Sequence, residues 1–310
     1  MVDAAVSVLV ATCRGGKYLE LAFDSLRDQT LTDFEAVIVD DGSPNPAEID
    51  ALAARLERVT VIHQRRSGLA ISRNVSLSLA SGEFIAFLDD DDLYEPEKLE
   101  RQIAELRAHP DAIGCHTQFT LIDGAGRLTG RGDGGPFDLR SLLRGELHPF
   151  FATMLIRKCA IDRCGWFSSN FPNREDLDLL YRLAREGEFR FLREPLYRYR
   201  LRHSTNMSHQ LVHSTITSIE ALEIQQNWAA MAGDDEMRAD ATIGLKRVKG
   251  YWIETGLSAA VASARKGAWN EAFELATMAF RLDPMQAVSA LARKGGAARR
   301  KRKRGSAPEY

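Results

Sequence analysis

Four consecutive carboxylates, Asp89 to Asp92, directly follow an apolar run and are the groups in the chain best suited to chemistry. Residues 84–88 predict a buried strand, and Ser81-Gly82 before them ends a helix and lets that strand begin. Crowded like charges destabilise a fold unless a cation lies among them. In open α/β sheets, ligands bind beyond the carboxyl ends of the strands. We therefore expect a divalent metal that holds a phosphate here; a solvated acidic loop is the alternative.

The elements that must position these acids alternate between strand and helix over the first hundred residues. Short β-branched runs at 6–10, 36–39, 59–62 and 84–88 are separated by segments with apolar residues at helical spacing. This alternation predicts the α/β class, with a Rossmann-like, mostly parallel sheet flanked by helices.

The pattern changes near residue 112, where strand-like and helical pieces no longer alternate regularly. Two short strands are expected at 189–192 and 196–201, on either side of Pro195, with a helix before them at 176–186. From residue 208 the chain is helical in character. Within this C-terminal helical appendage, residues 267–284 are similar to one tetratricopeptide-type helix pair.

Composition places the chain among ordinary soluble proteins. Of its 310 residues, 45% are hydrophobic and 27% are charged, and the net charge of −2 gives no reason to expect a nucleic-acid partner. The four cysteines show no metal-binding spacing, which favours reduced thiols. Neither an apolar run of about 18 residues nor a signal peptide is recognisable, so a cytoplasmic protein is expected.

Four segments in the first ninety-two residues carry polar groups where predicted strands end or helices begin. They are Thr12-Cys13-Arg14, Asp40-Asp41-Gly42-Ser43, Ala70-x-x-Arg73-Asn74 and Leu88-Asp89-Asp90-Asp91-Asp92. In this combination and order they make the chain resemble the family 2 glycosyltransferases with the GT-A fold, over residues 5–205. Two later segments add to the resemblance: Glu175-Asp176 and the stretch from Arg200 to His203.

The resemblance implies a domain organisation. Residues 1–207 would form the GT-A domain, with a nucleotide-binding half at 1–110 and an acceptor-side half at 111–207. Residues 208–292 would form the helical C-terminal region, and 293–310 a basic disordered tail.

The resemblance also implies a nucleotide-sugar donor and a divalent metal, Mn²⁺ or Mg²⁺, at its diphosphate. Asp91 would bind the metal directly with Asp89 assisting, and His203 would complete the coordination. Asp90 would face the ribose or the sugar. Hard carboxylate oxygens suit either ion, which acts as a Lewis acid when the glycosidic bond breaks.

Three further positions correspond to nucleotide contacts of the family. Asp41 would bind the nucleobase, Arg73 would reach the nucleotide, and Thr12 would touch the base or the ribose. The chain has Cys13-Arg14 where the family commonly has Tyr-Asn, so a stacking aromatic side chain is missing. A UDP-sugar is the favoured donor.

Inverting transfer needs a general base for the acceptor hydroxyl. Asp176 matches the family's base, and its neighbour Glu175 is the alternate. Acids at a helix N-terminus are also favoured by the helix dipole, which is the alternative reading of this pair.

The acceptor is expected to be a glycan or a lipid-linked sugar in cell-surface glycan or polysaccharide synthesis. It would contact residues 130–151, where His148, Phe150 and Phe151 are candidates for its pocket, although either Phe could instead be a core residue. A non-catalytic nucleotide-sugar-binding protein and a sugar-phosphate nucleotidyltransferase are the alternative functions. A dehydrogenase is excluded, because no GxGxxG follows the first strand.

The C-terminal regions suggest two partners. Residues 293–304 hold eight Lys/Arg and no acid. They favour peripheral contact with the anionic inner membrane face, while a solvated tail or an acidic partner stays open. The helical region at 208–284 could instead form a homo-oligomer.

Overall fold

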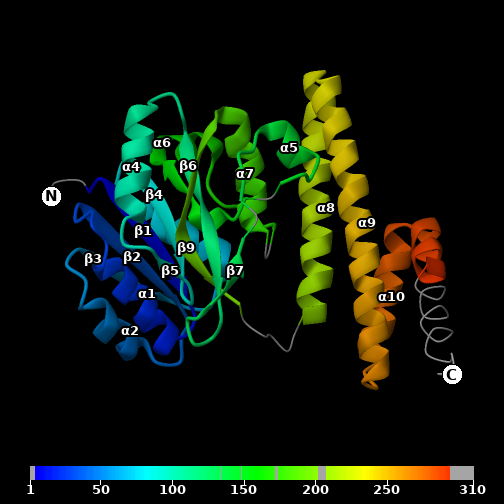
Figure 1. The fold of residues 1–310 in the computed structure, drawn as a ribbon, viewed down its shortest axis with the longest axis horizontal. Coiled ribbons are helices and arrows are strands. Elements are labelled where there is room, and N and C mark those ends of the chain that lie inside the picture. The colour runs from blue at the N-terminus through cyan, green and yellow to red at the C-terminus, as the bar shows by residue number, and fades with distance from the viewer. Residues whose placement is uncertain (1–3, 133, 148, 172–173, 202–206, 294–310) are drawn as a thin grey trace, which may run out of the picture. The chain divides into compact units, whose positions relative to one another are not determined.

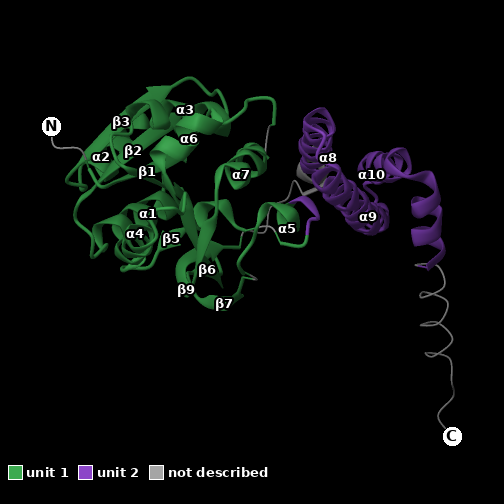
Figure 2. Ribbon diagram, turned by 90° about the horizontal axis from the view of Figure 1, so that it is seen from above, with its two compact units in different colours: residues 1–142, 146–203 green, residues 143–145, 204–310 purple. Residues whose placement is uncertain are grey.

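The computed structural model describes residues 4–132, 134–147, 149–171, 174–201 and 207–293 (Figure 1). The chain divides into two compact units, one of residues 1–142 with 146–203 and one of residues 143–145 with 204–310 (Figure 2).

The first unit is built on a mixed, mostly parallel sheet whose first half is entirely parallel. Its strands are β1 (Val6–Thr12), β2 (Phe34–Asp41), β3 (Val59–Gln64) and β4 (Phe84–Asp89). They pair in the order β3-β2-β1-β4, and consecutive strands are connected through helices. The predicted α/β class and Rossmann-like arrangement are therefore confirmed.

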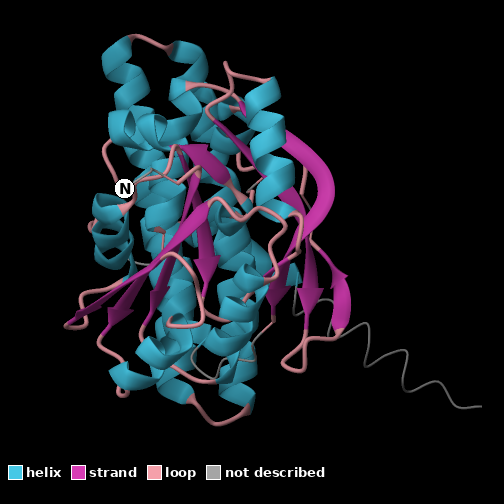
Figure 3. Cartoon of the chain, turned by 90° about the vertical axis from the view of Figure 1, so that its left-hand side faces the viewer, coloured by secondary structure: helices cyan, strands magenta, loops and turns pink. Residues whose placement is uncertain are grey.

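The second half of the sheet is mixed. β8 (Leu155–Arg157) lies antiparallel between β4 and β6 (Gly114–Ile122), and β6 pairs in parallel with β9 (Phe189–Arg200). The short strands β5 (Leu93–Tyr94) and β7 (Leu128–Arg131) pair antiparallel with β9 and β6. The sheet twists along its length, as Figure 3 shows.

The two short strands expected around Pro195 are one strand, β9. Leu192 pairs with Thr117 and Pro195 pairs with Gln118, so the two residues between Leu192 and Pro195 bulge out of the ladder. A bulge accommodates a proline because it removes the need for a ladder N–H at that point. The prediction of a break was wrong for this reason.

Helices cover both faces of the sheet. Figure 2 shows α1 (Lys17–Arg27) and α4 (Lys98–Ala108) on one face, and α3 (Leu69–Leu79) and α6 (Lys158–Cys164) on the other. Each inward face follows from helical spacing: α1, for example, buries residues 19, 22, 23 and 26. The remaining elements are α2 (Pro46–Ala53), α5 (Leu139–Leu143), a 3₁₀ turn (Phe151–Thr153) and α7 (Glu175–Glu186).

The second unit consists of α8 (Met207–Ala232), α9 (Asp235–Arg265) and α10 (Trp269–Leu282), with a further helical stretch at 284–293. The short segment Leu143–Gly145 belongs to this unit, and Arg144 Nε lies 2.6 Å from Asp240 Oδ1. Residues 267–284 contain one helix rather than the expected pair. None of the helices in the described ranges is both long and apolar enough to cross a membrane.

Candidate functional site

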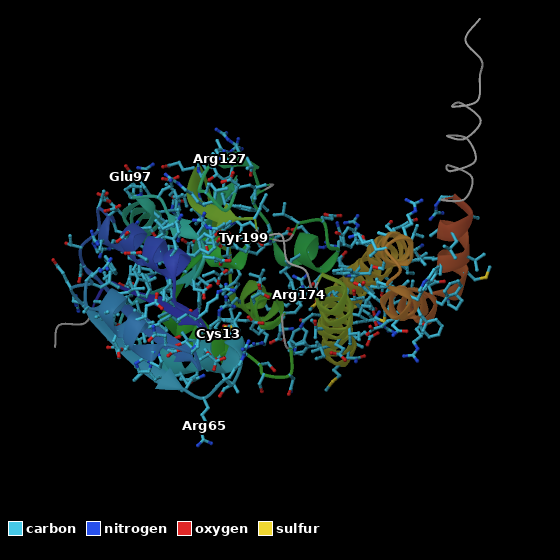
Figure 4. The ribbon with its side chains drawn as sticks, turned by 90° about the horizontal axis from the view of Figure 1, so that it is seen from below. Cys13, Arg65, Glu97, Arg127, Arg174 and Tyr199 are labelled. Atoms are coloured by element: carbon cyan, nitrogen blue, oxygen red, sulfur yellow. The ribbon has the colours of Figure 1, made fainter. Side chains whose placement is uncertain are left out.

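A pocket of about 570 Å³ lies where β1, β2 and β4 end and where α3 and α7 begin. Cys13 and Arg174, labelled in Figure 4, mark two of the contributing segments: Cys13 lines the pocket after β1, and Arg174 precedes α7. Eight of the nine predicted site residues line it: Thr12, Asp41, Arg73, Asp89, Asp90, Asp91, Glu175 and Asp176. The ninth, His203, lies outside the described residues.

Asp41, at the end of β2, holds the loop that leads into α3. Its carboxylate accepts hydrogen bonds from the backbone N–H of Ser67 (2.7 Å) and Gly68 (2.9 Å) and from Gln64 Nε2 (2.7 Å). Burial works to raise the pKa of Asp41, but these donors outweigh it and lower the pKa. The side chain is thus a fixed anion at the pocket wall.

Asp40 points to the other side of the same strand end and closes a turn. It accepts hydrogen bonds from the backbone N–H and the hydroxyl of Ser43, both at 2.8 Å, as expected for a turn cap. Gly42 in this turn has φ +76°, and a side chain there would come within 2.9 Å of the backbone nitrogen of Arg66. Glycine is therefore required at this position for both backbone conformation and space.

The run of four acids divides between the pocket and the core. Asp89, Asp90 and Asp91 line the pocket, whereas Asp92 is 1% exposed. Asp92 accepts hydrogen bonds from Tyr197 Oη at 2.9 Å and from the backbone N–H of Arg200 at 2.7 Å. Burial raises the pKa of Asp92 to about 8. Asp92 is a structural residue that joins the end of β4 to β9.

Arg73, on α3, forms ion pairs with Glu175 at the start of α7 and with Asp89 at the end of β4. It is 7% exposed; its Nη1 lies 2.8 Å from Glu175 Oε1, and its Nη2 lies 3.3 Å from Asp89 Oδ1. Three phenylalanine rings surround the guanidinium at 5.4–5.9 Å. A buried arginine paired in this way orients both carboxylates. Its direct contact with a nucleotide stays a prediction.

The two carboxylates that open α7 differ in their surroundings. Glu175 is 3% exposed and ion-paired, and burial raises its pKa although Arg73 opposes the shift. Asp176 is only partly buried, lines the pocket, and accepts the backbone N–H of Leu177 at 2.8 Å. Of the two, Asp176 is the more accessible to a ligand.

Two arginines of the site were not predicted. Arg14 lies in the loop after β1, with Nη2 2.7 Å from Asp90 Oδ1. Arg200, on β9, is 2% exposed and donates from Nε to the backbone oxygen of Asp91 at 2.7 Å and from Nη1 to that of Asp123 at 2.9 Å. The only signal for Arg200 was its place at the start of the Arg-x-x-His segment, because its partners are distant in sequence.

The pocket wall carries oxygen donors of the kind that a divalent metal binds. Three adjacent carboxylates at one pocket wall are the oxygen ligands that Mg²⁺ and Mn²⁺ prefer. Thr12 and Arg14 already occupy the two oxygens of Asp90, whereas Asp91 Oδ2 lies 3.7 Å from Arg14. No group of three or more His, Cys, Asp or Glu poised to hold an ion occurs within the described ranges. The donor types are those that a divalent metal prefers, and Asp91 as its ligand stays a prediction.

Two of the three acceptor candidates can be placed, while His148 lies outside the described residues. Phe151 is 3% exposed, and its ring packs 4.9 Å from that of Phe87. Phe150 is partly buried and packs against the rings of Tyr197 and Tyr199 at 5.4 and 4.9 Å. Phe151 is therefore a core residue, and only Phe150 keeps some exposure.

A Rossmann-like sheet with a pocket at its carboxyl edge is the architecture of the doubly wound α/β proteins, which bind their ligands at this edge. Residues 7–165 match the family Glycosyl transferase family 2, which is half of the chain. The chain therefore belongs to the family 2 glycosyltransferases.

Similarity to individual proteins agrees with this assignment. The chain is 29% identical over 218 residues to the putative glycosyltransferase EpsH of Bacillus subtilis, covering 65% of this chain and 62% of EpsH. It is 27% identical over 269 residues to chondroitin synthase of Escherichia coli, covering 86% of this chain but 36% of that protein. The chain thus spans less than two thirds of these relatives.

Solved structures show the same fold. The S. aureus TarS fragment 1–349 in complex with UDP aligns over 94% of this chain and 91% of that one, with a TM-score of 0.58 and 18% identity. Its complex with UDP-GlcNAc aligns over 87% and 90%, with a TM-score of 0.56 and 19% identity. The GT-A-type architecture expected from the sequence is confirmed.

Proposed function

We propose that this chain transfers a sugar from a nucleotide-sugar donor to a hydroxyl group of a glycan or lipid-linked acceptor, with inversion at the anomeric carbon. The observation that carries the proposal is the single pocket that collects the acidic strand ends and the carboxylates of α7. Transfer from a sugar nucleotide needs charge compensation for a leaving diphosphate and a base for the acceptor. This pocket offers groups for both tasks.

A UDP-sugar is the favoured donor, and the TarS complexes with UDP and UDP-GlcNAc support this choice. We propose that Asp41 binds the nucleobase and that Thr12 contacts the nucleobase or the ribose. Asp90 would contact the ribose or the sugar, and Arg73 would reach the nucleotide. Asp41 lines the pocket as an anion held by Gln64, Ser67 and Gly68, and a carboxylate is a suitable acceptor for a ligand N–H. The nucleotide-binding half would be residues 1–110 and the acceptor-side half 111–207.

We also propose dependence on Mn²⁺ or Mg²⁺. Asp91 would hold the ion, with Asp89 assisting and His203 completing the set. When bound, such an ion acts as a Lewis acid that neutralises the charge on the leaving diphosphate. The protein's own part is to orient the ligands: Arg73 holds Asp89, and Arg200 fixes the backbone of Asp91.

The proposed base is Asp176. It takes the proton of the acceptor hydroxyl as that oxygen attacks the anomeric carbon. The new glycosidic bond forms on the face opposite the leaving diphosphate, whose bond to the sugar breaks, and this inverts the configuration. Asp176 is favoured over Glu175 because Glu175 is buried and paired with Arg73.

Release of nucleoside diphosphate tests the proposal. The protein is incubated with Mn²⁺, a panel of UDP-, GDP- and dTDP-sugars, and glycan acceptors, and we expect release with one donor that stops in excess chelator. A donor that raises the melting temperature without any release would favour a non-catalytic nucleotide-sugar-binding protein instead.

A role in polysaccharide or cell-surface glycan synthesis is supported by the relatives named chondroitin synthase and hyaluronan synthase. We place the protein in the cytoplasm, with the basic segment 293–304 in contact with an anionic membrane face. Each Lys or Arg near such a surface contributes about 1 kcal/mol, which salt weakens. At low salt the protein should sediment with anionic but not with neutral vesicles. Equal sedimentation of a variant ending at Ala292 would contradict this.

Self-association through the helical region is a separate proposal. Trp269 and Phe273 on α10 are 70% and 75% exposed and lie four residues apart, on one face of the helix. Light scattering should show an oligomer that W269A/F273A dissociates. A wild-type monomer at all concentrations would refute it.

A further inference from the structure

Arg14 places a positive charge on Asp90 and beside Asp91, the acid proposed to hold the metal. It extends from the loop after β1, and its Nη2 lies 2.7 Å from Asp90 Oδ1 and 3.7 Å from Asp91 Oδ2. Thr12, which donates to the other oxygen of Asp90 at 2.7 Å, also accepts the backbone N–H of Arg14 at 3.2 Å. A hydrogen bond to Thr12 thus fixes the backbone of Arg14 at the end of β1, while its side chain lines the pocket.

Arg14 and Arg73 both pair with acids of the pocket, but they differ in how exposed their side chains are. Arg73 is held by two carboxylates with a side chain 8% exposed, so it cannot leave without stranding a buried charge. Arg14 has a side chain 49% exposed and lines the pocket. Its partner Asp90 is buried, with a side chain 10% exposed, so the guanidinium can leave only when another cation takes its place beside that carboxylate.

The charge balance of the pocket suggests why the guanidinium of Arg14 would change partner. Six carboxylates and three arginines line it. A nucleoside diphosphate adds further negative charge, so it can bind only with added cations or with rearrangement of those present. A divalent ion next to Asp90 and Asp91 would in turn meet the guanidinium of Arg14, and two cations cannot share that place without repulsion.

We propose that Arg14 is a built-in counterion of the donor site: paired with Asp90, it competes with the divalent metal for the place beside Asp91 when no donor is present, and it pairs with the donor's diphosphate when metal and donor are bound. This rests on the proposed function. The guanidinium can move from one carboxylate to a phosphate group because its planar fork binds both geometries equally well.

The exchange predicts effects of opposite sign on two ligands. Without Arg14, Mn²⁺ alone should bind more tightly, because its competitor is gone. UDP in the presence of Mn²⁺ should bind more weakly, because a cation for the diphosphate is gone. A residue that only supports the shape of the pocket would weaken both, so the pair of signs is diagnostic of exchange.

The experiment measures Mn²⁺ binding by the electron paramagnetic resonance of the free ion, and UDP binding at saturating Mn²⁺ by calorimetry, on the full-length protein. We expect Arg14→Ala to raise the affinity for Mn²⁺ about tenfold and to lower the affinity for UDP about tenfold. Arg14→Lys keeps a charge without the fork, so it should leave Mn²⁺ binding near the wild-type value and lose part of the UDP affinity.

Arg55→Ala is the matched control. Arg55 is 47% exposed and forms an ion pair of 2.8 Å with Glu20, outside the pocket, so its loss should change neither affinity. Weaker or unchanged Mn²⁺ binding in Arg14→Ala, in a wild type that binds Mn²⁺ and UDP, overturns the role of Arg14 and leaves the proposed function standing. A wild type that binds neither ligand overturns both.

Discussion

Two adjacent acids at the end of β4 lie in opposite environments. Asp91 faces the pocket beside Arg14, whereas Asp92 is buried and bonded to Tyr197 and Arg200. The pocket side keeps its carboxylates near arginines and within reach of a ligand. The core side uses a carboxylate as a hydrogen-bond acceptor for groups that would otherwise be unpaired. The same residue type therefore lines a ligand pocket on one side and stabilises the core on the other.

The same contrast extends to other ionisable groups of this unit. Lys98 is fully buried, donates to Gln102 Oε1 at 2.6 Å, and burial lowers its pKa to about 7. His116 is 1% exposed, and burial lowers its pKa to about 4. Core groups are thus biased toward their neutral forms, as desolvation requires. We expect pocket substitutions to change turnover and core substitutions to change stability.

The largest effect is expected from Asp91→Asn, which should lower turnover by about 10³-fold or more, because it removes the charge that we propose holds the metal at the diphosphate. Its melting temperature should stay at the wild-type value. Nucleoside diphosphate release measures the first quantity and thermal unfolding the second. Full turnover by the variant, or by the wild type in excess chelator, would refute the metal role of Asp91.

Asp176→Asn should lower turnover by about 10²–10⁴-fold, which is the usual contribution of general-base assistance. Donor affinity, measured by calorimetry, should be nearly unchanged. Glu175→Gln is the comparison variant, because it removes the partner of buried Arg73 and should reduce stability as well. If Asp176→Asn instead loses donor affinity while bound donor still reacts, Asp176 is a binding residue and Glu175 becomes the better base.

Asp92→Ala should destabilise the protein by about 2–4 kcal/mol, because the Tyr197 hydroxyl and the Arg200 N–H would each lose a buried acceptor. Urea unfolding measures this loss. Asp92→Asn retains an acceptor oxygen and should lose less. An unchanged free energy of unfolding in Asp92→Ala would remove the distinction between the two acids.

The smallest effect concerns pH. The pKa of His116 is about 4 in the folded protein and about 6.5 when unfolded, so between these values the unfolded state binds more protons. Stability is therefore lost as the pH falls from 6.5 to 4, with a slope of up to about 1.4 kcal/mol per pH unit.

His116→Phe should lack this contribution, since the ring lies between those of Phe137 and Phe191 and its Nε2 has no hydrogen-bond partner. Between pH 7 and pH 5 the wild type should lose about 1–2 kcal/mol more than the variant in urea unfolding. Identical losses would show that His116 does not titrate in this window.

Much of the fold could be predicted because its signals are local. β-Branched runs predict the four parallel strands, and each site motif directly follows a strand or opens a helix. Shorter elements were missed: β5 has two residues and β8 has three, too few for any periodicity. The bulge that carries Pro195 through β9 depends on pairing with β6, which a linear pattern does not contain.

Residue types and their order along the chain were sufficient to place eight predicted residues at one pocket, because parallel strands bring their carboxyl ends to the same edge of a sheet. Which of those residues pair with one another, and which stay accessible to a ligand, was decided only by the tertiary structure. Arg73 and Glu175 are 102 positions apart, and Asp92 and Tyr197 are 105 apart. Such partners are chosen by which side chains the packed core leaves within hydrogen-bond distance. That choice separates Asp91 from Asp92, two identical residues with identical local sequence signals.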